Sequence, residues 1–160
     1  MKLLSLMVFM LLGALLSQTG QRVDLEREKA ELLKIHRLDR EAHFKTDVDL
    51  LMEHAADEFI YVGEGKISRI KRAEGRKQFE EYFRGAKYYE WDDLEPPIVR
   101  VSDDATMAWM IVRTRVRRTQ VKPSGQVEER KFVYAGIMTY EKQQGTWKRI
   151  ANVSTFERDN

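Results

Sequence analysis

The chain has 160 residues, of which 34% are charged and 42% are hydrophobic, and its formal net charge is +2. This length suits one domain with a core of its own, and the near balance of 28 basic and 26 acidic residues gives no strong field for a nucleic-acid partner. The absence of cysteine excludes a disulfide framework, a thiolate zinc site and a cysteine nucleophile.

The first segment has the pattern of a secretory signal peptide. Lys2 is its only charge, and residues 3–16 follow as an almost unbroken apolar run. That run is shorter than the roughly 20 residues that a membrane-spanning helix needs. We therefore expect removal of residues 1–21 as a signal peptide, which leaves residues 22–160 as a single secreted or periplasmic domain with no membrane segment. A retained N-terminal anchor is the alternative.

Helical patterns dominate the first half of the mature chain. Apolar residues recur at spacings of three, four and seven from Asp24 to Lys45, which predicts a long helix. Thr46 is expected to cap a short second helix, and a third helix is expected at about Glu74 to Arg84. The run from Phe59 to Val62 has the composition of a strand. The basic stretch from Lys66 to Lys77 is expected to be a solvated loop and helix edge.

Strand patterns fill the second half of the chain. Four segments combine β-branched residues with flanking turn residues, namely Ile98 to Val101, Thr106 to Thr119, Val127 to Glu141 and Trp147 to Phe156. Helices first and strands afterwards indicate the α+β class. The strands are expected to form one curved antiparallel sheet packed on about three N-terminal helices.

The first predicted helix carries a polar pair within its apolar stripe. Asp39 lies four residues after Ile35 and three before Ala42, and His43 follows four residues after Asp39. The side chains of Asp39 and His43 therefore share one helical face. A carboxylate beside an imidazole can orient it and tune its proton affinity, as general acid–base catalysis requires. A helix edge facing water, or a structural hydrogen-bonded pair, is the alternative.

Other polar candidates are weaker. The strand pattern puts Arg113 on the same face as Trp109, where it could bind a carboxylate or an oxyanion in a pocket, and a solvent-facing arginine is the alternative. His36 and His54 are expected at surface or edge positions. No histidine pair has the carboxylate spacing of a zinc motif, so no metal and no other cofactor is expected.

Several short runs carry a resemblance to one known superfamily, and these are His36-Arg37 through Ala42-His43, Asp47, Ala56-Asp57-Glu58-Phe59-Ile60-Tyr61-Val62 and Gly145-Thr146-Trp147-Lys148-Arg149-Ile150-Ala151-Asn152. In them the chain resembles the nuclear transport factor 2-like superfamily, which includes ketosteroid isomerases and SnoaL-like polyketide cyclases, and the SnoaL-like group most of all. The resemblance covers about Leu32 to Phe156. It implies a cystatin-like cone, in which a curved sheet wraps on helices around a pocket at the open end, often with dimerisation through the sheet.

The resemblance also implies which side chains face the cavity. Ketosteroid isomerases have two aspartates where this chain has about Gly63 and Gly136, and their helix tyrosine becomes Asp39. Steroid isomerisation by that mechanism is therefore not expected. The same mapping turns five side chains toward the cavity, those of Asp39, Tyr61, Tyr134, Asn152 and Ser154.

Three functions stay open on these grounds. The first is an exported protein that binds a small apolar or aromatic ligand, with candidate contacts at Tyr61, Trp109, Arg113, Tyr134, Asn152 and Ser154. The second is a lyase or hydrolase that uses Asp39 and His43 as its acid–base pair. The third is a non-catalytic association domain that forms a homodimer through its sheet.

Overall fold

The computed structural model describes residues 24–157, so the expected signal peptide at residues 1–21 lies outside the described residues. The helices are α1 (Leu25–Lys45), α2 (Val48–Met52) and α3 (Arg72–Phe83). The strands are β1 (Ala55–Gly63), β2 (Lys66–Lys71), β3 (Ala86–Asp93), β4 (Ile98–Val101), β5 (Met107–Val121), β6 (Val127–Gln143) and β7 (Thr146–Phe156). Within residues 24–157, no helix is long and apolar enough to cross a membrane.

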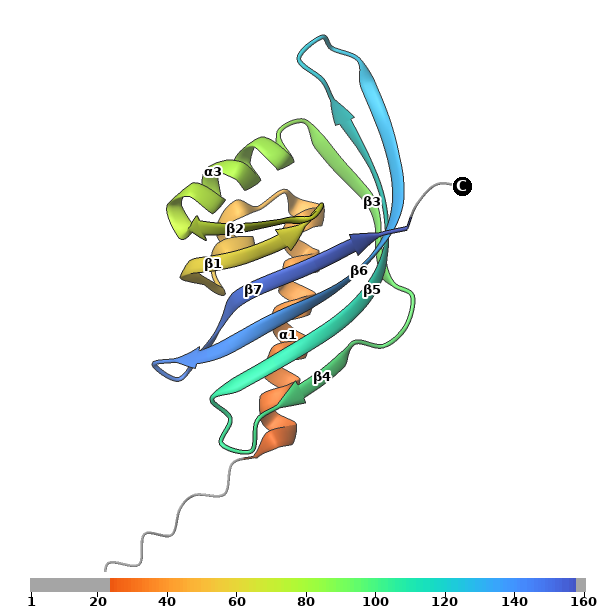
Figure 1. The fold of residues 1–160 in the computed structure, drawn as a ribbon. Helices are drawn as coiled ribbons and strands as arrows, with labels where there is room; N and C mark the ends of the chain where they lie inside the picture. The colour runs from red at the N-terminus through yellow and green to blue at the C-terminus, as the bar shows by residue number, and fades with distance from the viewer. Residues whose placement is uncertain (1–23, 158–160) are drawn as a thin grey trace, which may run out of the picture.

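The strands form one curved sheet that wraps around α1 (Figure 1). Their order is β2-β1-β7-β6-β5-β3, and β4 pairs with β5 beside this path. The expected α+β cone is confirmed, with one correction to the sheet. Strands β1 and β7 run parallel, so the sheet is mixed rather than wholly antiparallel. Parallel neighbours need a long crossover, and here most of the chain separates the two strands.

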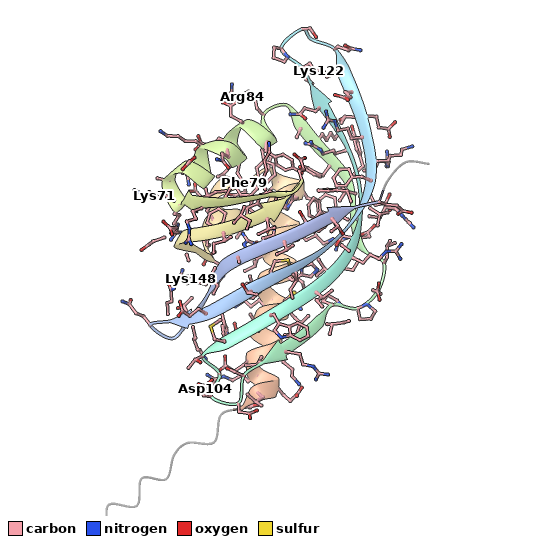
Figure 2. The ribbon with its side chains drawn as sticks, viewed as in Figure 1. Lys71, Phe79, Arg84, Asp104, Lys122 and Lys148 are labelled. Carbon is pink, nitrogen blue, oxygen red and sulfur yellow. The ribbon has the colours of Figure 1, made fainter. Side chains whose placement is uncertain are left out.

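The two faces of the sheet follow from the alternation along β5. Residues Ala108, Met110, Val112, Thr114, Val116 and Arg118 are buried on the face toward α1, which we call the inner face. The residues between them point to the opposite, outer face. The hairpin of β5 and β6 extends beyond α3, with Lys122 at its projecting end (Figure 2).

The first helix ends at Lys45, as its sequence pattern predicts, but the cap of the second helix differs from the prediction. Thr46 does not cap the second helix, because it adopts a left-handed conformation with φ 50° and its N–H donates back to the last carbonyls of α1. Asp47 caps α2 instead, since its Oδ1 accepts a hydrogen bond of 3.0 Å from the Leu50 N–H. This sharp change of direction brings α2 against the side of α1.

Two strands of the sheet have no clear sequence pattern. In β2, which replaces the expected solvated loop, Ile70 is the only buried residue, and the strand is an edge strand rich in lysine and arginine. In β3, a register shift between Tyr88 and Glu90 places Tyr88 and Trp91 together in the core although they are three residues apart. That shift breaks the two-residue period by which strands are recognised.

A buried ion pair fixes the start of α1 to the sheet. The Glu28 carboxylate accepts a hydrogen bond of 2.8 Å from the Trp147 indole and lies 2.6 Å from the Lys142 ammonium group. Burial alone would raise the pKa of Glu28, but these two contacts outweigh it and hold that pKa below its ordinary value. The carboxylate therefore stays ionised, and α1 is held diagonally across the inner face, which leaves space beside its second half.

Candidate functional site

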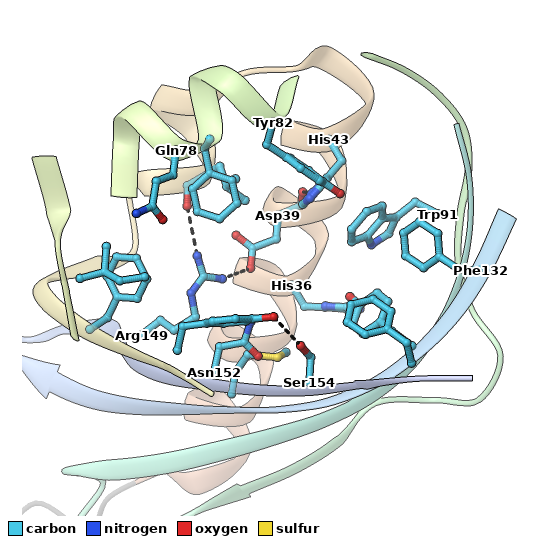
Figure 3. A pocket seen from close by; sticks show the side chains of 18 residues that line it. His36, Asp39, His43, Gln78, Tyr82, Trp91, Phe132, Arg149, Asn152 and Ser154 are labelled. Atoms are coloured by element: carbon cyan, nitrogen blue, oxygen red, sulfur yellow. Dashed lines mark hydrogen bonds and ion pairs between the residues drawn. The ribbon is translucent and has the colours of Figure 1, made fainter. Parts of the chain in front are cut away.

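A cavity of about 430 Å³ lies between the second half of α1, helix α3 and the inner face of the sheet (Figure 3). Its wall is largely aromatic, formed by Phe59, Tyr61, Phe79, Tyr82, Trp91, Phe132, Tyr134 and Phe156. Its polar lining consists of His36, Asp39, His43, Gln78, Arg149, Asn152 and Ser154. The aromatic rings come from α3 and four different strands, so the cavity depends on the assembled fold.

An ion pair crosses the cavity between α1 and β7 (Figure 3). Nη1 of Arg149 donates to Oδ2 of Asp39 at 2.7 Å, and Nη2 donates to the carbonyl of Leu51 at 3.4 Å. Burial works to lower the pKa of Arg149, but the Asp39 carboxylate outweighs it and the net effect raises that pKa. Arg149 therefore stays charged, and the Asp39 carboxylate is its ion-pair partner inside the cavity.

His43 does not pair with the Asp39 carboxylate. Its Nδ1 lies 2.6 Å from the backbone carbonyl oxygen of Asp39, and its ring stacks on Trp91 with ring centres 3.7 Å apart. Burial lowers the pKa of His43 to about 4, so the ring is neutral at pH 7 and Nδ1 donates to that carbonyl. Within residues 24–157, no hydrogen bond joins the two side chains, which corrects the expectation of a carboxylate–imidazole pair.

His36 is buried and lines the cavity, contrary to the expectation of a surface or edge position. Its Nε2 lies 2.8 Å from Oδ2 of Asp93 at the end of β3. The other oxygen of Asp93 accepts a hydrogen bond of 3.1 Å from the Thr114 hydroxyl. His36, Asp39 and His43 thus form a polar row along one face of α1, each side chain fixed by a different partner.

Four side chains expected at the cavity do line it, namely those of Tyr61, Tyr134, Asn152 and Ser154. The hydroxyls of Tyr61 and Ser154 lie 3.3 Å apart across β1 and β7 (Figure 3). A Cβ atom on Gly63 would come within 2.5 Å of the Tyr61 hydroxyl oxygen, so the glycine leaves the space in which this tyrosine lies.

Trp109 and Arg113 do not belong to the cavity. The pairing of β5 with β6 has no register shift, so the alternation along β5 is unbroken and both residues point to the outer face. Arg113 is exposed there. These two ligand-binding assignments were therefore wrong, and the solvent-facing alternative holds for Arg113.

Arg149 is a site residue that sequence patterns miss. Side chains of a regular strand alternate between the two faces, so Arg149, an odd number of residues before Ser154 and Asn152, would share neither residue's side and would lie on the outer face. In the structure, Ile150 is the extra residue of a register shift between β6 and β7, because Tyr140 pairs with Arg149 and Thr139 with Ala151. This bulge turns Arg149 back to the inner face, where it meets Asp39. Trp91 was missed for the same kind of reason, since the shift in β3 hides its direction.

Solved structures share this fold, although no protein-family model and no curated protein matches the sequence. An NTF2-like protein from Cytophaga hutchinsonii superposes with a TM-score of 0.64 at 12% identity, covering 81% of this chain and 98% of that one. A ketosteroid isomerase-like protein from Erwinia carotovora atroseptica gives 0.62 at 15% identity, covering 82% and 98%. The association domain of C. elegans CaMKII gives 0.55 at 13% identity, covering 81% and 96%. The chain therefore has the nuclear transport factor 2-like fold that its sequence predicts.

The ion pair in the cavity makes a direct prediction about stability. Asp39→Asn keeps the shape of the side chain but leaves the buried Arg149 guanidinium without a counter-charge. The free energy of unfolding, measured with urea, should fall by about 1–3 kcal/mol. Arg149→Met in the same chain should restore part of the loss, because it removes the unpaired charge.

Glu41→Gln is the matched control for Asp39→Asn. Glu41 is an exposed carboxylate on the same helix and forms a surface ion pair with Lys45, so its replacement should change the free energy of unfolding by less than about 0.5 kcal/mol. Equal effects of the two substitutions would show that the Asp39–Arg149 pair does not stabilise the fold.

Proposed function

We propose that this chain is an exported small-molecule-binding protein, of the SnoaL-like kind, whose ligand has an apolar or aromatic body. The aromatic cavity between α1, α3 and the sheet is the observation that supports it. Its volume of about 430 Å³ falls in the range of small-molecule sites, which are mostly apolar with a few placed polar groups.

The state of the polar groups favours binding over catalysis. A general base works best with a pKa near the working pH, whereas the pKa of His43 is about 4 and its Nδ1 is occupied by a backbone carbonyl. The Asp39 carboxylate is held by Arg149. Neither group is arranged to move a proton at neutral pH, so the acid–base enzyme is the weaker proposal.

A neutral fluorescent probe tests binding in the cavity. We expect N-phenyl-1-naphthylamine to bind saturably to the mature protein with an increase in its fluorescence. Ser154→Phe places a ring inside the cavity and should weaken binding at least about tenfold, because the added ring occupies the space that the probe needs. Thr155→Phe adds a ring of the same kind on the next, exposed residue of β7 and should leave binding unchanged. Equal affinity of the two variants would place the probe elsewhere and contradict the proposal.

A second proposal is that two copies associate through the outer face. One cross-strand row on that face is entirely aliphatic and contains Ile98, Ile111, Ile137, Val153 and Val62. Ile98, Ile111 and Val153 are 48%, 37% and 38% exposed in the single chain. Association domains with the same fold exist among the structural neighbours, which supports a homodimer. Burying this row between two copies would remove apolar area from water.

Light scattering after gel filtration tests the dimer. Ile111→Asp places a charge within the aliphatic row and should convert a dimer into a monomer at micromolar concentration. Val127→Asp changes an exposed valine at the far end of the β5–β6 hairpin and should leave the dimer intact. A wild-type chain that stays monomeric at high concentration would refute this proposal.

The proposal of export rests on the N-terminal sequence pattern alone. We expect the mature protein to begin near Arg22, since the apolar run is followed by small and polar residues there. Intact-mass measurement of protein recovered outside the cytoplasm checks this. A mass that includes Met1 to Gln21 would indicate a retained anchor instead.

A further inference from the structure

Arg118 is a buried cation without an ion-pair partner in the part of the chain that the structure describes. Its side chain lies on the inner face of β5 and the residue is 4% exposed. Within residues 24–157, no carboxylate lies within ion-pair distance of it, whereas Arg149 and Lys142 pair with Asp39 and Glu28. Buried charges are normally paired, because desolvation of a lone charge is costly. No carboxylate among the described residues therefore offsets the charge of this arginine.

One edge of the Arg118 guanidinium is free. Nη1 donates a long hydrogen bond of 3.5 Å to the carbonyl of Tyr82 at the end of α3, while Nε has no partner in the described part of the chain. The Tyr88 hydroxyl, also buried, has no hydrogen-bond partner either. Burial raises the pKa of Tyr88 above its ordinary value, so this hydroxyl stays protonated and is able to donate. Both groups belong to one aromatic cluster, since the Arg118 guanidinium carbon lies 5.7 Å from the centre of the Tyr88 ring.

Aromatic rings separate Arg118 from the cavity. Its guanidinium carbon lies 4.5 Å from the centre of the Tyr82 ring and 5.7 Å from that of Tyr88. Cation–π contact of this kind offsets part of the cost of burying the charge. Tyr82 is half-buried and also lines the cavity, so this one ring covers the arginine on one side and faces the pocket on the other.

A second arginine lies directly beside the first. Arg130 of β6 is the cross-strand partner of Arg118, so both side chains leave the sheet on the inner face. Like charges in that position repel each other. Arg130 is exposed, and among the described residues its one ion-pair contact is with Glu128 at 3.3 Å on its own strand. Phe132, two residues on and also on the inner face, lines the cavity. The positive pair therefore lies at the hairpin end of the pocket.

We propose that Arg118, Tyr88 and Arg130 form an anion site that takes the carboxylate of an organic acid whose apolar body fills the aromatic cavity. The inference rests on the proposed ligand-binding function and adds the chemical class of the ligand. A carboxylate fits because the free edge of a guanidinium presents parallel N–H groups that match its two oxygens. Tyr82 turns aside to admit it, and the bound anion supplies the missing counter-charge.

A matched pair of ligands tests the site in the wild-type protein. Naphthalene-2-carboxylate and naphthalene-2-carboxamide have the same apolar body, but only the first is an anion. We expect the carboxylate to bind at least about tenfold more tightly at pH 7, measured by calorimetry, since a hydrogen bond to a charged partner is worth that much or more. Equal affinities, or tighter binding of the amide, would overturn the anion site while leaving the ligand pocket intact. If the neutral fluorescent probe and both naphthalene ligands fail to bind, the pocket itself is refuted as well.

Variants on one strand separate a binding role from a structural one. Arg118→Met keeps much of the side-chain volume and should abolish the preference for the carboxylate, while the amide still binds. Arg113→Met removes an arginine from the outer face of the same strand and should keep the preference. Arg118→Lys retains the positive charge but lacks the parallel N–H groups of the guanidinium, and it should lose most of the preference for the carboxylate. If Arg118→Met lowers the melting temperature yet retains the preference, the arginine is only structural and the proposal fails.

Discussion

The ion pair of Asp39 with Arg149 governs the shape of the interior. It joins the middle of α1 to β7 at 2.7 Å, across space that would otherwise close by apolar packing. Neither charge is stable there without the other, because an isolated charge in an apolar interior is strongly disfavoured. The helix and the strand are therefore held at a fixed separation, and the aromatic side chains around them line a cavity rather than fill it.

The polar groups in the middle of the cavity are held by partners within the protein. Asp39 pairs with Arg149, the His36 imidazole contacts Asp93, and His43 is uncharged at pH 7. Among residues 24–157, Arg118 beside the hairpin is a buried cation without an ion-pair partner. If Arg118 takes a carboxylate as proposed, an amphipathic ligand would meet an apolar centre and one charged end, and that asymmetry would fix its direction.

The sequence predicts the parts of the fold that have regular periods. The long helix from residue 24 to 45 and the strands β5, β6 and β7 have apolar residues at the spacing of one buried face, and the structure confirms them. Strand β2 is missed because an edge strand with one buried residue has no such period. Strand β3 is missed because its register shift puts Tyr88 and Trp91 on one side despite their odd spacing.

Regular periods and register shifts also decide which site residues can be recognised from the sequence. Asp39 is recognised because a carboxylate within an apolar stripe conflicts with its own helix, and such a conflict marks a cavity or a partner. Its partner Arg149 is hidden, because the bulge at Ile150 reverses the direction that alternation assigns to it. Arg118 is hidden for a different reason. Alternation along β5 places it inside correctly, but only the assembled fold shows that no carboxylate of residues 24–157 meets it there. The sequence pattern therefore identifies the elements with regular periods and one member of the ion pair. Which charged side chains pair with each other depends on contacts between residues far apart in the chain, and these contacts determine the candidate site.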